Sequence, residues 1–224
     1  MLEDIKAIAF DIDGTLYPQV SLYYKIIPYV IKHLNFYRYY SATRRKMHRT
    51  APLPDFYEYQ ARIYAENAHC SVADARKMLK EIAYDGLKPL FRDKIKPYKY
   101  TTEAFKTLKE KGFKLALLSD FPPSQKGDVW GLSNYCDLVL GSEELGALKP
   151  SKYPFGVLSM MLEVEPSQIL YVGNSIKYDI RGAKNAGMKT AMICTKFRSF
   201  ISTRVREADF SFSNYRQFLD IVLK

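Results

Sequence analysis

Two carboxylates, Asp11 and Asp13, follow directly after the apolar run IKAIAF, and Gly14 and Thr15 come close behind. Burying a charge is costly unless a counter-charge or hydrogen bonds compensate it. The pattern therefore indicates one of two things. It is either an ordinary strand end whose polar residues meet water, or a site where a cation and an anionic ligand bind.

Further polar clusters stand in comparable places along the chain. Ser119 and Asp120 close the run FKLALLSD, Lys149 precedes a helical pattern in GALKPSKYP, Asn174 follows QILYVG, and Asp179 lies about one helical turn beyond. In a parallel α/β sheet, ligands bind where the carboxyl ends of the strands meet. The clusters together offer a candidate nucleophile, an acid/base, a hydroxyl, a cation and metal-binding oxygens.

The elements that must position these residues alternate along the chain. Short β-rich runs, several of them apolar at successive positions, are typical of strands covered on both faces. They lie at residues 5–10, 113–119, 137–141, 168–173, 189–194 and 209–213. Helical patterns lie at residues 101–112, 152–164, 176–187 and 214–224. The alternation predicts an α/β fold with a doubly wound, Rossmann-like parallel sheet.

Residues 19–95 interrupt this alternation, because they hold no convincing strand. Three Tyr-rich stretches there have helical spacing, and Ser71 is a plausible N-cap for the last of them. Pro28 predicts a kink or a late start in the first. We therefore expect an inserted helical subdomain at 19–95.

The overall charge is basic: 34 Lys and Arg against 24 Asp and Glu give a formal net charge of +10. Such a balance favours anionic partners, which include phosphorylated metabolites, nucleic acid and acidic membrane surfaces. The three cysteines form no CxxC or Cys/His cluster, which argues against a zinc site and a disulfide framework. No apolar stretch approaches the roughly 20 residues of a membrane span. The opening residues MLEDIK show no secretory signal, so we expect a cytoplasmic protein.

The stretches DIDGTLY, LLSD, LKP and VGNSIKYDIRGA resemble, in order and spacing, the four motifs of the haloacid dehalogenase superfamily. The resemblance implies a Rossmann-like catalytic core at residues 1–18 and 96–224 and a helical cap at 19–95. It also implies a phosphatase, hydrolysing a small phosphate monoester such as a sugar phosphate or a nucleotide through an aspartyl-phosphate.

The resemblance assigns a role to each candidate residue. Asp11 is the expected nucleophile, and Asp13 the expected acid that protonates the leaving oxygen and then the base that activates water. Ser119 and Lys149 are expected to act on the phosphate, the first by a hydrogen bond and the second by its charge. The substrate-binding residues expected from the same motifs are Gly14, Thr15, Ser119, Asp120 and Lys149.

The expected cofactor is Mg²⁺, which prefers hard oxygen ligands and keeps several waters. Its ligands would be Asp11, the backbone carbonyl of Asp13 and Asn174, with Asp179 fixing a metal-bound water. Two positions depart from the family pattern. Asn174 stands where an Asp is common, which predicts weaker metal binding, and Asp120 stands where an Asn is frequent.

Two other functions are compatible with parts of the sequence. A phosphomutase uses the same core residues. The basic segment TRRKMHR (43–49), with nearby tyrosines, could instead indicate an RNA-binding module. We rank the RNA-binding module far below an enzyme, because it leaves the four motifs unexplained. The expected partner is therefore a small phosphorylated metabolite, with neither a membrane nor a nucleic acid.

Overall fold

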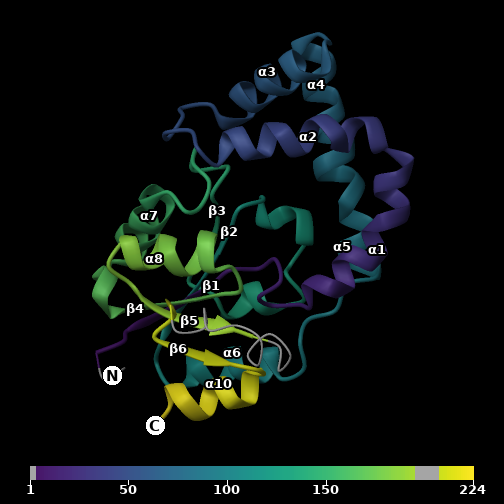
Figure 1. The fold of residues 1–224 in the computed structure, drawn as a ribbon. Coiled ribbons are helices and arrows are strands. Elements are labelled where there is room, and N and C mark those ends of the chain that lie inside the picture. Colours follow the sequence, from purple (N-terminus) through teal and green to yellow (C-terminus); the bar gives the residue numbers. More distant parts are fainter. Residues whose placement is uncertain (1–3, 195–206) are drawn as a thin grey trace.

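A computed structural model describes residues 4–194 and 207–224 of the chain. Its strands form one parallel sheet in the order β3-β2-β1-β4-β5-β6 (Figure 1). The strands are β1 (Ala7–Phe10), β2 (Lys114–Ser119), β3 (Leu138–Gly141), β4 (Ile169–Gly173), β5 (Lys189–Ile193) and β6 (Phe210–Phe212). The predicted α/β fold with a parallel sheet is confirmed, and each strand falls within a predicted run.

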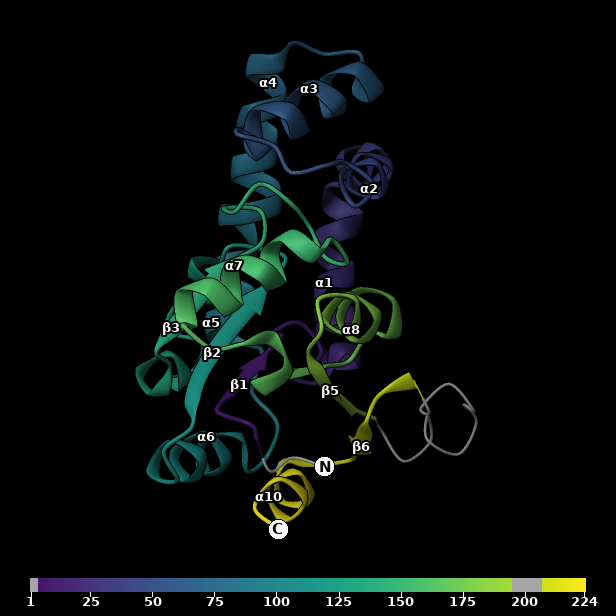
Figure 2. The ribbon, with the colours of Figure 1, turned by 90° about the vertical axis from the view of Figure 1, so that its left-hand side faces the viewer.

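Helices cover both faces of the sheet, as the apolar runs require (Figure 2). Ile8 and Phe10 of β1 point into a core shared with α6 (Thr101–Glu110) and α10 (Tyr215–Val222). Ala7 and Ala9 point to the opposite face, toward a core shared with α7 (Lys152–Leu162) and α8 (Arg181–Asn185). Burial on both sides explains why β1 carries no polar residue until its carboxyl end.

The connections hold several short helices, some of them not α-helical. The predicted helix at 176–187 begins as a π-helix, η6 (Ile176–Ile180), and continues as α8. Three of the described 3₁₀ turns lie in the segment from β2 to β4: η3 (Pro123–Lys126), η4 (Leu132–Tyr135) and η5 (Pro166–Gln168). The turn η3 carries Lys126 and the π-helix η6 carries Asp179. Both side chains contact residues of the polar clusters that follow the strands.

All of residues 19–95 are described, and none of them is in a strand. The helices are α1 (Gln19–Lys32), α2 (Leu34–Met47), α3 (Phe56–Ala68), α4 (Val72–Met78), η1 (Leu79–Tyr84), η2 (Asp85–Leu87) and α5 (Lys88–Asp93). Ser71 caps α4 by accepting a hydrogen bond from the amide of Asp74, as predicted. Pro28 lies inside α1 without ending it.

This helical layer contacts the loops that follow the strands (Figure 1). The Nδ1–H of His48 donates to the carbonyl of Lys149 at 2.7 Å, and the amide of Leu53 donates to the carbonyl of Gly146 at 3.0 Å. The layer therefore stands over the edge of the sheet where the polar clusters gather. The boundaries at residues 18/19 and 95/96 stay a prediction. Within the described ranges, no helix has the length and apolar character needed to cross a bilayer.

Candidate active site

A buried lysine joins two of the predicted carboxylates. Asp11 follows β1, Asp179 lies in η6, and Lys149 comes from the loop after β3. The Nζ of Lys149 lies 2.7 Å from Asp11 Oδ1 and 2.7 Å from Asp179 Oδ1. It also donates to the hydroxyl of Tyr171 at 3.2 Å. All three N–H groups of this ammonium therefore have acceptors.

Burial and charge act against each other at this triad. Asp11, Lys149 and Asp179 are 4%, 2% and 2% exposed, so each charge depends on its partners for compensation. Burial raises the pKa of Asp11 to about 7; Lys149 opposes this rise, and the charge of Asp179 adds to it. Burial alone would lower the pKa of Lys149, but Asp11 and Asp179 raise it well above its ordinary value.

A second cluster surrounds Asp13. The hydroxyl of Tyr17 donates to Asp13 Oδ1 at 2.6 Å, and the hydroxyl of Ser119 donates to Oδ2 at 3.0 Å. The Nζ of Lys126, from η3, also lies 2.9 Å from Oδ2. Burial would raise the pKa of Asp13, but Lys126 and the two hydroxyls outweigh it and hold the pKa below 3.8. The resting arrangement therefore favours Asp13 as a carboxylate.

The loop after β1 is packed against the end of β4. Gly14 has φ of +86°, and a Cβ there would lie only 2.2 Å from the side-chain nitrogen of Asn174. The hydroxyl of Thr15 donates to Asp11 Oδ2 at 2.8 Å, while its amide donates to the carbonyl of Ile12. The close approach requires glycine at position 14. Phosphate binding by Gly14 and Thr15 stays a prediction.

Asp179 and Asp120 each hold a loop in place. Asp179 Oδ2 accepts hydrogen bonds from the amides of Asn174 and Ser175, at 3.1 and 2.9 Å. Asp120 Oδ1 accepts one from the amide of Lys149, at 3.0 Å. Asp120, which stands where the family frequently has Asn, therefore anchors the backbone of Lys149, the lysine that contacts Asp11. A substrate contact by Asp120 stays a prediction.

A family model described as haloacid dehalogenase-like hydrolase matches residues 5–187. The chain belongs to this family. The matched range contains both clusters and the helical layer, so the resemblance in the four motifs extends to most of the hydrolase.

Named relatives are phosphatases. The hydrolase is 29% identical over 235 aligned residues to the glyceraldehyde 3-phosphate phosphatase of Methanopyrus kandleri, covering 97% of each chain. It is 30% identical over 131 residues to the pyrophosphatase PpaX of Halalkalibacterium halodurans, covering 57% of this chain and 60% of that protein. The crystal structure of a HAD phosphatase from Thermococcus onnurineus shares the fold, with a TM-score of 0.66, 22% identity and coverage of 97% and 98%.

The donor set of the hydrolase fits a hard divalent cation. Asp11 and Asn174 follow β1 and β4, which are neighbours in the sheet, and Asn174 lies against the loop that carries Asp13. Among the described residues, no group of three or more His, Cys, Asp or Glu could hold a metal. A cation held by Asp11 and Asn174 would have carboxylate and amide oxygens as ligands, which are the hard donors that divalent cations such as Mg²⁺ and Ca²⁺ take in proteins.

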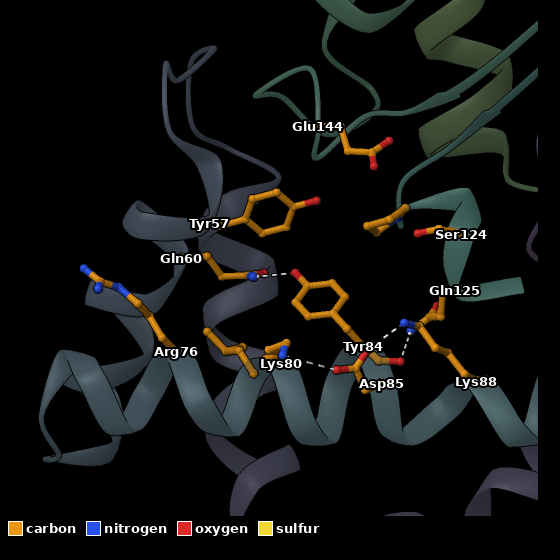
Figure 3. Close-up of a pocket in the computed structure, with 12 residues that line it drawn as sticks. Tyr57, Gln60, Arg76, Lys80, Tyr84, Asp85, Lys88, Ser124, Gln125 and Glu144 are labelled. Atoms are coloured by element: carbon orange, nitrogen blue, oxygen red, sulfur yellow. Dashed lines mark hydrogen bonds and ion pairs between the residues drawn. The ribbon is translucent and has the colours of Figure 1, made fainter. Parts of the chain in front are cut away.

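A pocket of about 410 Å³ is lined by residues of the helical layer and of the core (Figure 3). Tyr57 and Tyr84 of the helical layer face Ser124 and Glu144 of the core across it. Asp11, Asp13 and Lys149 are absent from the described residues that line it. The pocket therefore marks a space between the helical layer and the core, not the reacting centre.

Sequence reasoning missed three residues of the site. Tyr17 is four residues beyond Asp13, a spacing that brings side chains together on one helical turn, so it could have been noticed. Tyr171 lies inside an apolar strand and was hidden by that pattern. Lys126 stands in PPSQKG, where no motif marks it. Only the fold brings its charge next to Asp13.

Proposed function

We propose that the protein is a Mg²⁺-dependent phosphatase that hydrolyses small phosphate monoesters through an aspartyl-phosphate at Asp11. The observation that carries the proposal is the 2.7 Å contact between Lys149 Nζ and Asp11 at the carboxyl end of β1. Membership of the hydrolase family and the phosphatases among its relatives support it.

In the first step, a carboxylate oxygen of Asp11 attacks phosphorus and the ester P–O bond breaks. The leaving oxygen takes a proton from Asp13, which must first gain that proton as the substrate binds. Lys149 offsets the negative charge that Asp11 and the phosphoryl group bring together. The hydroxyl of Ser119, which contacts Asp13 at 3.0 Å, would turn to donate a hydrogen bond to a phosphoryl oxygen.

In the second step, Asp13 removes a proton from water while the water oxygen bonds to phosphorus. The bond between phosphorus and Asp11 breaks, which releases phosphate and restores the carboxylate. The Mg²⁺ would be held by Asp11, the carbonyl of Asp13 and Asn174, with Asp179 fixing a metal-bound water. When bound, it would neutralise charge and orient the phosphoryl group.

The substrate class is a small phosphorylated metabolite. One relative that matches the whole chain is named for glyceraldehyde 3-phosphate, and another, at 26% identity, for ribulose-1,5-bisphosphate. The helical layer, acting as a cap over the strand ends, would exclude water and select the leaving group.

The test is the release of phosphate from p-nitrophenyl phosphate with Mg²⁺. We expect Asp11→Asn to lower kcat by about a thousandfold or more, because an amide cannot act as the nucleophile. A matched control is Asp220→Asn, an exposed aspartate on α10 outside the site, which should leave the rate unchanged. Turnover that persists in Asp11→Asn would contradict the proposal.

A further inference from the structure

A second buried lysine stands beside the proposed acid/base residue. Lys126 comes from η3, the turn after β2, and its side chain is 0% exposed. Its Nζ lies 2.9 Å from Asp13 Oδ2. A lysine is rarely fully buried unless it is paired, so the position of this charge calls for a reason.

Two aromatic rings frame the ammonium of Lys126. Its Nζ lies 5.2 Å from the ring centroid of Phe91 and 5.2 Å from that of Phe121. Both rings attract the charge through their π-faces. Phe91 comes from the helical layer and Phe121 from the core, so the ammonium is fixed where the two parts meet.

The hydrogen-bonding capacity of Lys126 is only partly used. An ammonium has three N–H donors. In the described part of the chain, its one hydrogen-bond acceptor is Asp13 Oδ2. Lys149 differs, because its donors reach Asp11, Asp179 and Tyr171. Because the side chain itself is 0% exposed, a further anionic oxygen would have to reach these N–H groups from the side of Asp13, and it would not need to displace Asp13.

Lys126 lies next to Asp13, the residue that would protonate the leaving group. In the proposed reaction Asp13 passes its proton to the leaving oxygen, so the rest of the leaving group starts next to Asp13. The Asp13 carboxylate is 26% exposed, and a ligand can reach it. A substituent carried on that ligand would start close to the ammonium of Lys126, because Nζ lies 2.9 Å from Asp13 Oδ2.

We propose that Lys126 binds a second anionic group on the leaving group, a carboxylate or a phosphoryl group. The inference rests on the proposed phosphatase function and narrows its substrates to bifunctional esters with two anions. Lys149 would serve the phosphoryl group that is transferred, and Lys126 the anion that departs with the alcohol.

The test compares two phosphate esters of nearly equal size as substrates of the full chain with Mg²⁺. One is 2-phosphoglycolate, and the other is the analogue in which an uncharged carboxamide replaces the carboxylate. We expect kcat/KM to be about tenfold or more higher for the carboxylate ester, because only its anion forms an ion pair with the ammonium, whereas the carboxamide oxygen accepts a weaker hydrogen bond. Propane-1,3-diol bisphosphate and the monophosphate extend the comparison to a phosphoryl anion.

Lys126→Met should reduce the preference to about twofold or less, mainly by raising KM for the ester that carries the second anionic group. Lys126→Arg keeps the charge and should keep most of the preference. The control is Lys109→Met, which removes an exposed lysine paired with Asp137 and should leave the preference intact. Circular dichroism and thermal unfolding establish that each variant folds.

Three results would overturn the inference: no preference in either pair, a preference unchanged in Lys126→Met, or an equal loss on both members of a pair. The last would mean that Lys126 only holds Asp13. Calorimetric binding of the same esters to Asp11→Asn, with and without Lys126→Met, separates this inference from the proposed function. Selective binding without turnover in the unmodified chain would retain the anion site and reject the phosphatase.

Discussion

At the scale of single residues, the site is two acids, each held by a lysine. Asp11 is paired with Lys149, and Asp13 with Lys126. The two acids differ in environment: burial raises the pKa of Asp11, whereas Lys126 and two hydroxyls overcome burial and lower that of Asp13. The proposed first step needs the opposite protonation, with Asp11 as a carboxylate and Asp13 as an acid, so substrate binding must lower the pKa of Asp11 and raise that of Asp13.

Asn174 sets the charge of the proposed metal site. Replacing it in Asn174→Asp adds one negative charge beside Asp11, so we expect the Mg²⁺ concentration for half-maximal activity to fall several-fold. A Mg²⁺ activation curve for phosphate release measures this. Asn185→Asp, an exposed change at the end of α8, is the control for charge alone. An unchanged curve in Asn174→Asp would argue against Asn174 as a ligand.

At the scale of elements, the end of β4 and the π-helix η6 determine where Asp179 lies. A Cβ on Gly173 would lie 2.3 Å from the Cβ of Asp179, so the two segments approach as closely as glycine allows. Asp179 in turn accepts hydrogen bonds from the amides of Asn174 and Ser175. The strand end, the turn and the π-helix thus form one rigid support for Lys149.

Gly173→Ala tests this support. The added methyl must displace Asp179, which loosens the contact with Lys149, so we expect kcat to fall by about tenfold or more while the sheet still forms. Phosphate-release kinetics measure the effect, and circular dichroism follows the fold. The control is Gly156→Ala in α7, where a Cβ would meet nothing within 4 Å. Full activity in Gly173→Ala would mean that Asp179 is not positioned by this contact.

The positions of the strands could be predicted from the sequence, whereas contacts between distant segments could not. The strands could be predicted because burial on both faces leaves runs of consecutive apolar residues. The carboxyl ends of the predicted strands then indicated Asp11, Ser119 and Asn174 as site residues. Lys126 could not be predicted, since its partner lies 113 positions away and neither sequence neighbourhood marks the contact. The π-helical start at Ile176 was also missed, because its apolar spacing reads as an α-helix.

At the scale of the whole molecule, the helical layer and the core are joined by buried polar contacts. Arg44 of α2 forms an ion pair with Glu143 of the core, and the hydroxyl of Tyr84 donates to the same carboxylate at 2.7 Å. Gln125 of η3 donates to the carbonyl of Ala83 at 2.7 Å. Arg44 belongs to the basic segment 43–49, so this segment contributes to the contact between the helical layer and the core.

We expect His48 to make the contact between the helical layer and the core depend on pH. Its ring stacks on Tyr178, with centroids 4.5 Å apart, and donates to the carbonyl of Lys149. Burial lowers the pKa of His48 below 6.5; Asp120 opposes this shift and Arg44 adds to it. Because the unfolded chain protonates first, the stability from His48 is present above pH 6.5 and is lost as the pH falls through the lowered pKa.

As the pH falls below about 6.5, we expect the unmodified protein to lose free energy of unfolding relative to His48→Phe, which keeps the stacked ring. The raised pKa of Asp11 acts in the opposite direction in both proteins, so the difference between them reports His48. Urea unfolding at several pH values measures both slopes. His33→Phe in the turn between α1 and α2 serves as the control, and it should show the same pH dependence as the unmodified protein. Equal slopes in His48→Phe and the unmodified protein would contradict this account.

The most direct test of the central claim is to trap the covalent intermediate. The protein is mixed with Mg²⁺ and a phosphate ester, quenched in acid during turnover, reduced with borohydride and analysed by peptide mass spectrometry. We predict that the acyl phosphate forms at Asp11, so that reduction converts this residue to homoserine and leaves Asp13 unchanged. Turnover without modification of Asp11, or modification at another carboxylate, would contradict the account.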